Sequence, residues 1–110
     1  MNIMDYQLKA ERTVDGTLSA KENLCNLTLG LNGECGEVTE LIKKHLFHDH
    51  KIEQKKLIEE IGDVMWYLTN IATFFKIPMT YILDENIKKL EERYPEGFSK
   101  EKSINRKEYK

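Results

Sequence analysis

The stretch LIEEIGDVMWYLTNIATFF, residues 57–75, decides the fold. Its apolar residues recur at alternating spacings of four and three, which is the pattern of one face of an α-helix. This apolar stripe consists of Leu57, Ile61, Val64, Leu68, Ile71 and Phe75. We therefore predict a long helix that begins near Glu53 and ends before the break at Pro78.

A second long helix is predicted before it, over residues 19–47. Ser19 and Glu22 have the spacing of a capping box, which marks the start of a helix. The apolar residues that follow have helical spacing: Leu24, Leu27, Leu31, Val38, Leu41 and Ile42. Two glycines are expected to kink or interrupt this helix: Gly30 and Gly33. The polar residues 48–51 are expected to form the turn between the two long helices.

Two shorter helices complete the prediction, one over about residues 4–13 and one over about residues 79–93. The latter is expected to bury Leu83, Ile87 and Leu90. Residues 99–110 are rich in lysine and have few apolar side chains, so we expect a loosely held polar tail. The predicted fold is all-α and resembles a four-helix bundle built on two long paired helices, with one domain over residues 1–98 and the tail after it.

Composition narrows the classes of function. The 17 basic and 19 acidic residues give a formal charge of -2 and no basic field that would attract nucleic acid. Cys25 and Cys35 lack the spacing of a disulfide scaffold or a zinc site. The N-terminal sequence lacks the pattern of a leader peptide, and no apolar stretch is long enough to span a membrane. We therefore expect a cytoplasmic protein that binds neither nucleic acid nor membranes.

The sequence E-x-G-[E/D]-V occurs twice, at residues 34–38 and 60–64. In each copy two acids lie three residues apart on one helix face, at the margin of an apolar stripe. These acids are Glu34, Glu37, Glu60 and Asp63. If the two helices pack side by side, four carboxylates converge, and lysine partners or a metal ion must offset their repulsion and partial burial.

A ligand set of carboxylates alone favours a hard cation, with Mg²⁺ first and Mn²⁺ as a substitute. The di-iron alternative requires histidines that this pattern lacks. Because Mg²⁺ commonly completes its coordination with water and phosphate oxygens, the site predicts a phosphorylated ligand. A glycine inside a helix is costly, so Gly36 and Gly62 are expected to mark a close approach between helices.

Three blocks together resemble the MazG-like nucleotide pyrophosphohydrolases. They are GLNGECGEV at residues 30–38, EEIGDVMWYL at residues 59–68 and NIKKLEERYPEGF at residues 86–98. The resemblance implies an all-α, Mg²⁺-dependent enzyme that splits a nucleoside triphosphate into the monophosphate and pyrophosphate. By the same resemblance the metal ligands are Glu34, Glu37, Glu60 and Asp63.

The third block also predicts contacts with the substrate. Asn86, Lys89 and Arg93 recur on one face of the last long helix, where they could meet a phosphate chain. Lys88 is expected to pair with a neighbouring acid instead, whereas Lys43 is a further phosphate-binding candidate.

For the reaction, we expect water to attack the α-phosphorus, with Glu34 as the general base because it is the acid most embedded in its stripe. The alternatives are a non-catalytic or regulatory module that binds Mg²⁺ and nucleotide, and a purely structural helical module. Trp66 is expected to pack at a subunit interface of a homo-oligomer, either a dimer or a tetramer. The histidines between residues 45 and 50 are assigned no chemistry. The resemblance also implies four possible neighbours of the nucleotide in the first segment: Tyr6, Gln7, Arg12 and Thr13.

Overall fold

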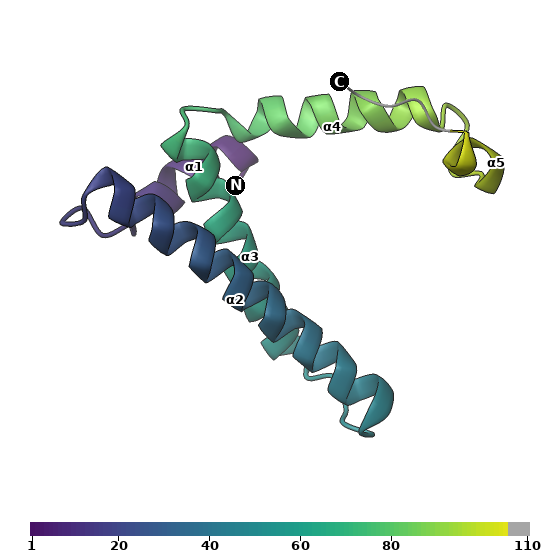
Figure 1. Ribbon diagram of the computed structural model, residues 1–110, viewed down its shortest axis with the longest axis horizontal. Helices are drawn as coiled ribbons and strands as arrows, with labels where there is room; N and C mark the ends of the chain where they lie inside the picture. The colour runs from purple at the N-terminus through teal and green to yellow at the C-terminus, as the bar shows by residue number, and fades with distance from the viewer. Residues whose placement is uncertain (106–110) are drawn as a thin grey trace.

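The computed structural model describes residues 1–105, which form five helices and no strand. Two long helices dominate, and three shorter ones flank them (Figure 1). In chain order the helices are α1 (Ile3–Glu11), α2 (Ala20–Phe47), α3 (Gln54–Phe74), α4 (Met79–Arg93) and α5 (Lys100–Ile104). The all-α class is confirmed.

The long helices α2 and α3 pack against each other as an antiparallel hairpin (Figure 1). The predicted capping box opens α2, since the Glu22 backbone N–H donates to Ser19 Oγ at 3.1 Å and the Ser19 N–H donates to Glu22 Oε1 at 3.0 Å. The expected interruption at Gly30 and Gly33 is wrong, because α2 continues through both glycines to Phe47. An unbroken α2 keeps the acids of its middle section opposite those of α3.

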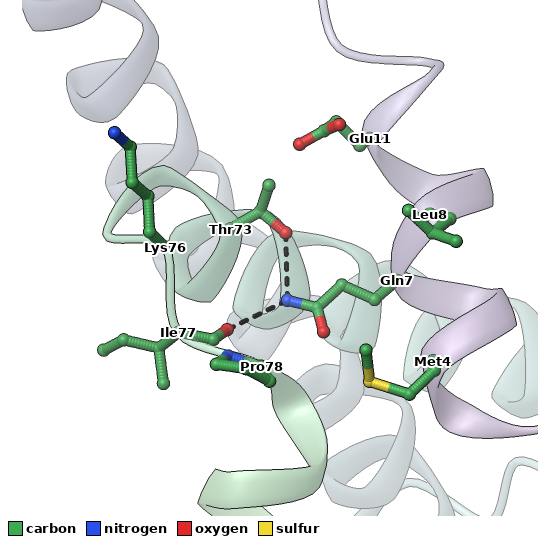
Figure 2. Close-up of a pocket in the computed structure, with 8 residues that line it drawn as sticks. All are labelled: Met4, Gln7, Leu8, Glu11, Thr73, Lys76, Ile77 and Pro78. Carbon is green, nitrogen blue, oxygen red and sulfur yellow. Dashed lines mark hydrogen bonds between the residues drawn. The ribbon is translucent and has the colours of Figure 1, made fainter.

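The short helix α1 contacts both α3 and α4, and its buried residue Gln7 connects them. Gln7 Nε2 donates to Thr73 Oγ1 at 3.1 Å and to the Ile77 carbonyl at 3.0 Å, as Figure 2 shows. Gln7 Oε1 accepts the backbone N–H of Met79 at 2.8 Å. One amide therefore connects α1, the end of α3 and the first residue of α4. Gln7 thus fixes a joint, and it does not line the acidic cavity described below.

Beyond this joint, α4 runs away from the α2–α3 hairpin (Figure 1). It contacts α1 near its start, where Met79 is buried. The expected burial of its apolar stripe is wrong within one chain: Leu83, Ile87 and Leu90 are all exposed. The short helix α5 occupies the first part of the predicted polar tail, and the end of that tail, residues 106–110, lies outside the described residues.

The apolar core is correspondingly small. Among the described residues the buried apolar residues are Ala10, Leu27, Ala72 and Met79. Within residues 1–105, every helix is too short or too polar to cross a bilayer.

Candidate metal centre

Three of the four predicted acids meet where α2 and α3 face each other. Glu34 comes from α2, and Glu60 and Asp63 come from α3. One carboxylate oxygen from each lies within 4.8 Å of the other two. Glu34 is on the same face of α2 as Leu27, the most deeply buried residue of that helix, so hairpin packing itself directs this acid toward α3. The convergence expected from the repeated pattern is thus confirmed for these three residues.

Partial burial makes the three charges costly. Glu34 and Glu60 are half-buried, whereas Asp63 is exposed. A hydrogen bond with the Glu60 carboxylate raises the pKa of Glu34, and partial desolvation and the charges of Asp63, Glu60 and Glu37 raise it further. Glu34 therefore holds a proton more strongly than an isolated glutamate. Glu60 Oε2 is buried and has no hydrogen-bond partner within the described residues.

Basic side chains do not neutralise this group. Among residues 1–105, Lys43 and Lys44 pair with Glu40, and Lys88 pairs with Glu85. The three clustered acids form no ion pair in this part of the chain. Of the two ways to offset the repulsion, lysine partners are therefore excluded in this part of the chain. The hard oxygen donors and the unpartnered Glu60 oxygen fit a divalent cation such as Mg²⁺.

Glu37, the fourth predicted ligand, is exposed and lies outside the group of three. It is one turn beyond Glu34, and its negative charge contributes to the raised pKa of Glu34. Glu37 is therefore a neighbour of the three closely spaced acids and its role as a ligand stays a prediction.

A cavity of about 350 Å³ opens beside the acids. Its wall consists of Thr13, Glu34, Asp63, Trp66 and Tyr67. Trp66 Nε1 donates to Thr13 Oγ1 at 2.7 Å, and the Trp66 and Tyr67 rings meet edge to face with their centroids 4.9 Å apart. The expectation that Trp66 packs at a subunit interface stays a prediction; within one chain its side chain binds Thr13 and lines the acidic cavity.

Two of the residues that the sequence placed near a nucleotide lie close to the acids, one of them in the cavity wall. Thr13 lines the wall, and Tyr6 lies close enough to Asp63 to feel its charge. Burial raises the pKa of Tyr6, and the Asp63 carboxylate raises it further. Sequence reasoning missed the aromatic wall, although the signal was present: Trp66 and Tyr67 lie one turn after Asp63 and so share its side of α3.

The close approach between the long helices occurs at a different glycine from those predicted. A Cβ atom at Gly36 or Gly62 would meet no atom within 4 Å, so the predicted close approach there is wrong for the single chain. A Cβ atom at Gly30 would lie 2.1 Å from Tyr67 Cε1. Gly30 is therefore the position that lets the Tyr67 ring approach the backbone of α2, at the edge of the acidic cavity.

Comparisons with known proteins show the family of the chain. Residues 22–98 match the model of the MazG nucleotide pyrophosphohydrolase domain. The matched range includes all three clustered acids. The chain belongs to the MazG family. It is similar to the gene 37 protein of Mycobacterium phage L5, with 33% identity over 105 residues, which cover 88% of this chain and 92% of that protein. No solved structure matches the chain significantly.

The MazG-like residues of the third block lie away from the acids. Asn86, Lys89 and Arg93 all belong to α4, and no α4 residue lines the acidic cavity. Asn86 is exposed, while Lys89 and Arg93 are half-buried. The structure of one chain therefore does not bring these three residues to the metal centre.

The lysines near the two helix ends are paired on the surface. Lys43 Nζ lies 3.8 Å from Glu40 Oε2, and both side chains are about half exposed. Lys88 pairs with Glu85 at 3.6 Å, which confirms its predicted role on a solvated face. His45 Nδ1 lies 2.9 Å from the His50 carbonyl at the end of α2, so this histidine belongs to a local turn.

Proposed function

We propose that this MazG-family chain is a Mg²⁺-dependent nucleoside triphosphate pyrophosphohydrolase. It hydrolyses a ribo- or deoxyribonucleoside triphosphate to the monophosphate and pyrophosphate by attack of water at the α-phosphorus. The observation that carries the proposal is the group of three carboxylates on facing helices, which has no basic partner in residues 1–105. A site of this kind attracts a divalent cation and, through it, phosphate oxygens.

The proposed Mg²⁺ ligands are Glu34, Glu60 and Asp63, with Glu37 as the fourth. Mn²⁺ is the expected substitute, because it accepts the same oxygen donors. When bound, the ion supplies positive charge opposite the triphosphate and lowers the pKa of the attacking water. Glu34 is the proposed general base because it is the acid most embedded in the apolar stripe of its helix and one of its carboxylate oxygens lies within 4.8 Å of an oxygen of each α3 acid.

The remaining parts of the proposed site bind the substrate. The aromatic wall formed by Trp66 and Tyr67 stands beside the acids, where it would support the nucleoside while the phosphates face the carboxylates. Asn86, Lys89, Arg93 and Lys43 are the proposed phosphate-binding residues; the family resemblance supports them, since none of the four lines the acidic cavity within one chain. The predicted homo-oligomer stays a proposal as well.

The decisive experiment is hydrolysis in ¹⁸O-labelled water of a panel of nucleoside triphosphates with Mg²⁺, with monophosphate, pyrophosphate and orthophosphate all quantified. We expect equal amounts of monophosphate and pyrophosphate, with the ¹⁸O label in the monophosphate. Label in pyrophosphate would place the attack at the β-phosphorus, and release of orthophosphate alone would exclude the proposed reaction. Binding of Mg²⁺ and nucleotide without products would favour the alternative regulatory module.

Variants assign the roles. Glu34→Gln should abolish turnover while Mg²⁺-dependent nucleotide binding largely survives, and unaltered turnover would exclude Glu34 as the base. Glu40→Gln is the matched control, because Glu40 is a surface acid of the same helix that pairs with lysines. Because Glu40 also pairs with Lys43, Glu85→Gln is a second control: Glu85 pairs with Lys88, which has no proposed role in binding, and the turnover of Glu85→Gln should match that of the original chain.

A further inference from the structure

The indole of Trp66 is held by two contacts at the wall of the acidic cavity. In the first, Trp66 Nε1 donates a hydrogen bond to Thr13 Oγ1 at 2.7 Å. In the second, the indole meets the Tyr67 ring edge to face, with the two centroids 4.9 Å apart. Tyr67 in turn lies against Gly30 of α2, where an added Cβ atom would overlap its ring. The position of the indole therefore depends on contacts that reach both the end of α1 and α2.

The proton of the Thr13 hydroxyl has a partner of its own. Thr13 Oγ1 donates to the carbonyl of Ala10, in the last turn of α1, at 2.8 Å. An indole N–H can only donate, whereas a hydroxyl donates one proton and still accepts through its lone pairs. The two hydrogen bonds therefore use Thr13 in the one way that satisfies both partners, and its hydroxyl cannot rotate without losing one of them.

The Ala10 carbonyl is tied to α3 as well. Asn70 Nδ2 donates to the Ala10 oxygen at 3.5 Å and to the Trp66 carbonyl at 3.1 Å. Only 2% of Asn70 is exposed, so this link is shielded from water. Hydrogen bonds thus run from the Trp66 side chain through three other residues back to the Trp66 backbone. We call these four residues the α1–α3 network; its members are Ala10, Thr13, Trp66 and Asn70.

The α1–α3 network restricts the motion of a side chain that lines the acidic cavity. Trp66 is only half-buried, so packing alone does not fix its ring. A side chain that is already fixed before a ligand arrives loses little further freedom on binding, and the affinity for the ligand is higher for that reason. Thr13 supplies the one hydrogen bond of the network that reaches the indole itself.

We propose that Thr13 is a positioning residue for nucleotide binding. Its hydroxyl holds the indole of Trp66 in the orientation that receives the nucleoside of the substrate beside the acids. Thr13 acts through Trp66 and makes no essential contact with the nucleotide itself. The proposal rests on the proposed function of the cavity as a nucleoside triphosphate site, and it leaves the reaction at the phosphates to the acids.

Steady-state kinetics of the Mg²⁺-dependent reaction test this role. Thr13→Val removes the hydroxyl and keeps the shape of the side chain, so KM for the nucleoside triphosphate should rise about fivefold while kcat stays within about twofold. Thr13→Ser retains a hydroxyl and should restore the original KM. An unchanged KM in Thr13→Val, or a fall in kcat alone, would overturn the proposal.

Thr28→Val is the matched control for the loss of a threonine hydroxyl. Thr28 is an exposed residue of α2, and its hydroxyl donates to the backbone carbonyls of Leu24 and Cys25 in the same helix. Its KM should equal that of the original chain. A rise in KM as large as that of Thr13→Val would show a general effect of valine and would contradict a specific role of Thr13.

A double-mutant comparison separates positioning from direct contact. Trp66→Phe removes the N–H group that Thr13 accepts, so Thr13→Val should have no further effect on KM in that background. The same rise in KM in both backgrounds would show that Thr13 contacts the nucleotide directly, which is incompatible with the proposal.

A third measurement requires no nucleotide. Trp66 is the single tryptophan of the chain, so the tryptophan fluorescence reports this side chain alone. Time-resolved anisotropy should show additional nanosecond motion of the indole in Thr13→Val but not in Thr13→Ser or Thr28→Val. Equal motion in Thr13→Val and the original chain would refute the positioning role. Circular dichroism verifies that each variant keeps its helices, and Thr13→Ala replaces Thr13→Val if the valine variant loses its helical signal.

The proposed hydrolase and the proposed role of Thr13 fail in different ways. If the original chain forms no products, the hydrolase is refuted, and the variants are then compared by their Kd for nucleotide with Mg²⁺, where the same fivefold change is expected in Thr13→Val. Hydrolysis by the original chain with an unchanged KM in Thr13→Val would refute the role of Thr13 alone. A chain that binds no nucleotide would overturn both.

Discussion

Replacing Gly30 by alanine should destabilise the protein, although the same change in an exposed helix is normally favourable. The new Cβ atom would lie 2.1 Å from Tyr67 Cε1 and 2.4 Å from Tyr67 Cζ. Since carbon atoms in contact normally lie about 3.5–4.0 Å apart, the Tyr67 ring must retreat by about 1.5 Å. Its neighbour Trp66 is held by a hydrogen bond to Thr13, which resists this displacement.

The magnitude follows from two opposing effects. Overpacking of this kind costs about 2 kcal/mol, and the better helix propensity of alanine returns about 1 kcal/mol. We expect a net loss of about 1 kcal/mol in the free energy of unfolding for Gly30→Ala. Gly33→Ala is the matched control, because nothing lies within 4 Å of its added Cβ atom. It should gain about 1 kcal/mol, so the two variants should differ in melting temperature by about 8 °C.

Urea unfolding followed by circular dichroism, at one fixed chain concentration, measures the difference. A double-mutant cycle with Tyr67→Ala then identifies the cause. Without the ring, Gly30→Ala should become stabilising, with a coupling energy of about 2 kcal/mol. Equal stabilisation by Gly30→Ala and Gly33→Ala in the original chain would refute the close contact between Gly30 and Tyr67.

Three further predictions concern the joint, the helix cap and the metal centre. Gln7→Leu should lower the free energy of unfolding by about 2 kcal/mol in urea titrations, because it leaves the backbone groups that Gln7 binds without partners; a loss no larger than that of an exposed-site change would contradict this. Hydrogen bonds with Ser19 lower the pKa of Glu22, so its stabilising effect is complete above the unfolded pKa and is lost as the pH falls through the lower folded value. The melting temperatures of the original chain and Glu22→Gln should therefore differ at neutral pH and converge below about pH 4; a constant gap would argue against the capping box. Mg²⁺ at about ten times its Kd should stabilise the protein by about 1.4 kcal/mol in thermal melts. Glu60→Gln should remove that gain and Glu40→Gln should keep it, and a gain retained by both would place Mg²⁺ elsewhere.

Most helix boundaries were accessible from the sequence because their signals are local. Pro78 immediately precedes the first residue of α4, and Ser19 with Glu22 caps α2, so these positions were correctly predicted. The convergence of Glu34 with the acids of α3 was also predictable, since two amphipathic helices joined by a short polar turn must pack against each other.

The sequence did not reveal in the same way which neighbour covers the apolar face of each helix. The stripe of α3 predicted burial of Leu68, yet 43% of that residue is exposed in the single chain. Periodicity identifies an apolar side of a helix, but it does not specify whether α1, α2 or a second chain covers it. For the same reason the glycine that receives a neighbouring side chain proved to be Gly30, and Gly36 lies in open space.

The sequence by itself determined an all-α chain, the positions of its breaks and the acids that would meet between its two long helices. These properties depend on backbone preferences and on spacing along one helix, which neighbouring residues largely decide. Only the tertiary structure decided that Trp66, Tyr67 and Thr13 form a cavity beside the acids, that Glu37 stays outside the cluster and that Gln7 fixes the direction of α4. These properties depend on how helices rotate and cross, and contacts between residues far apart in the chain set that geometry.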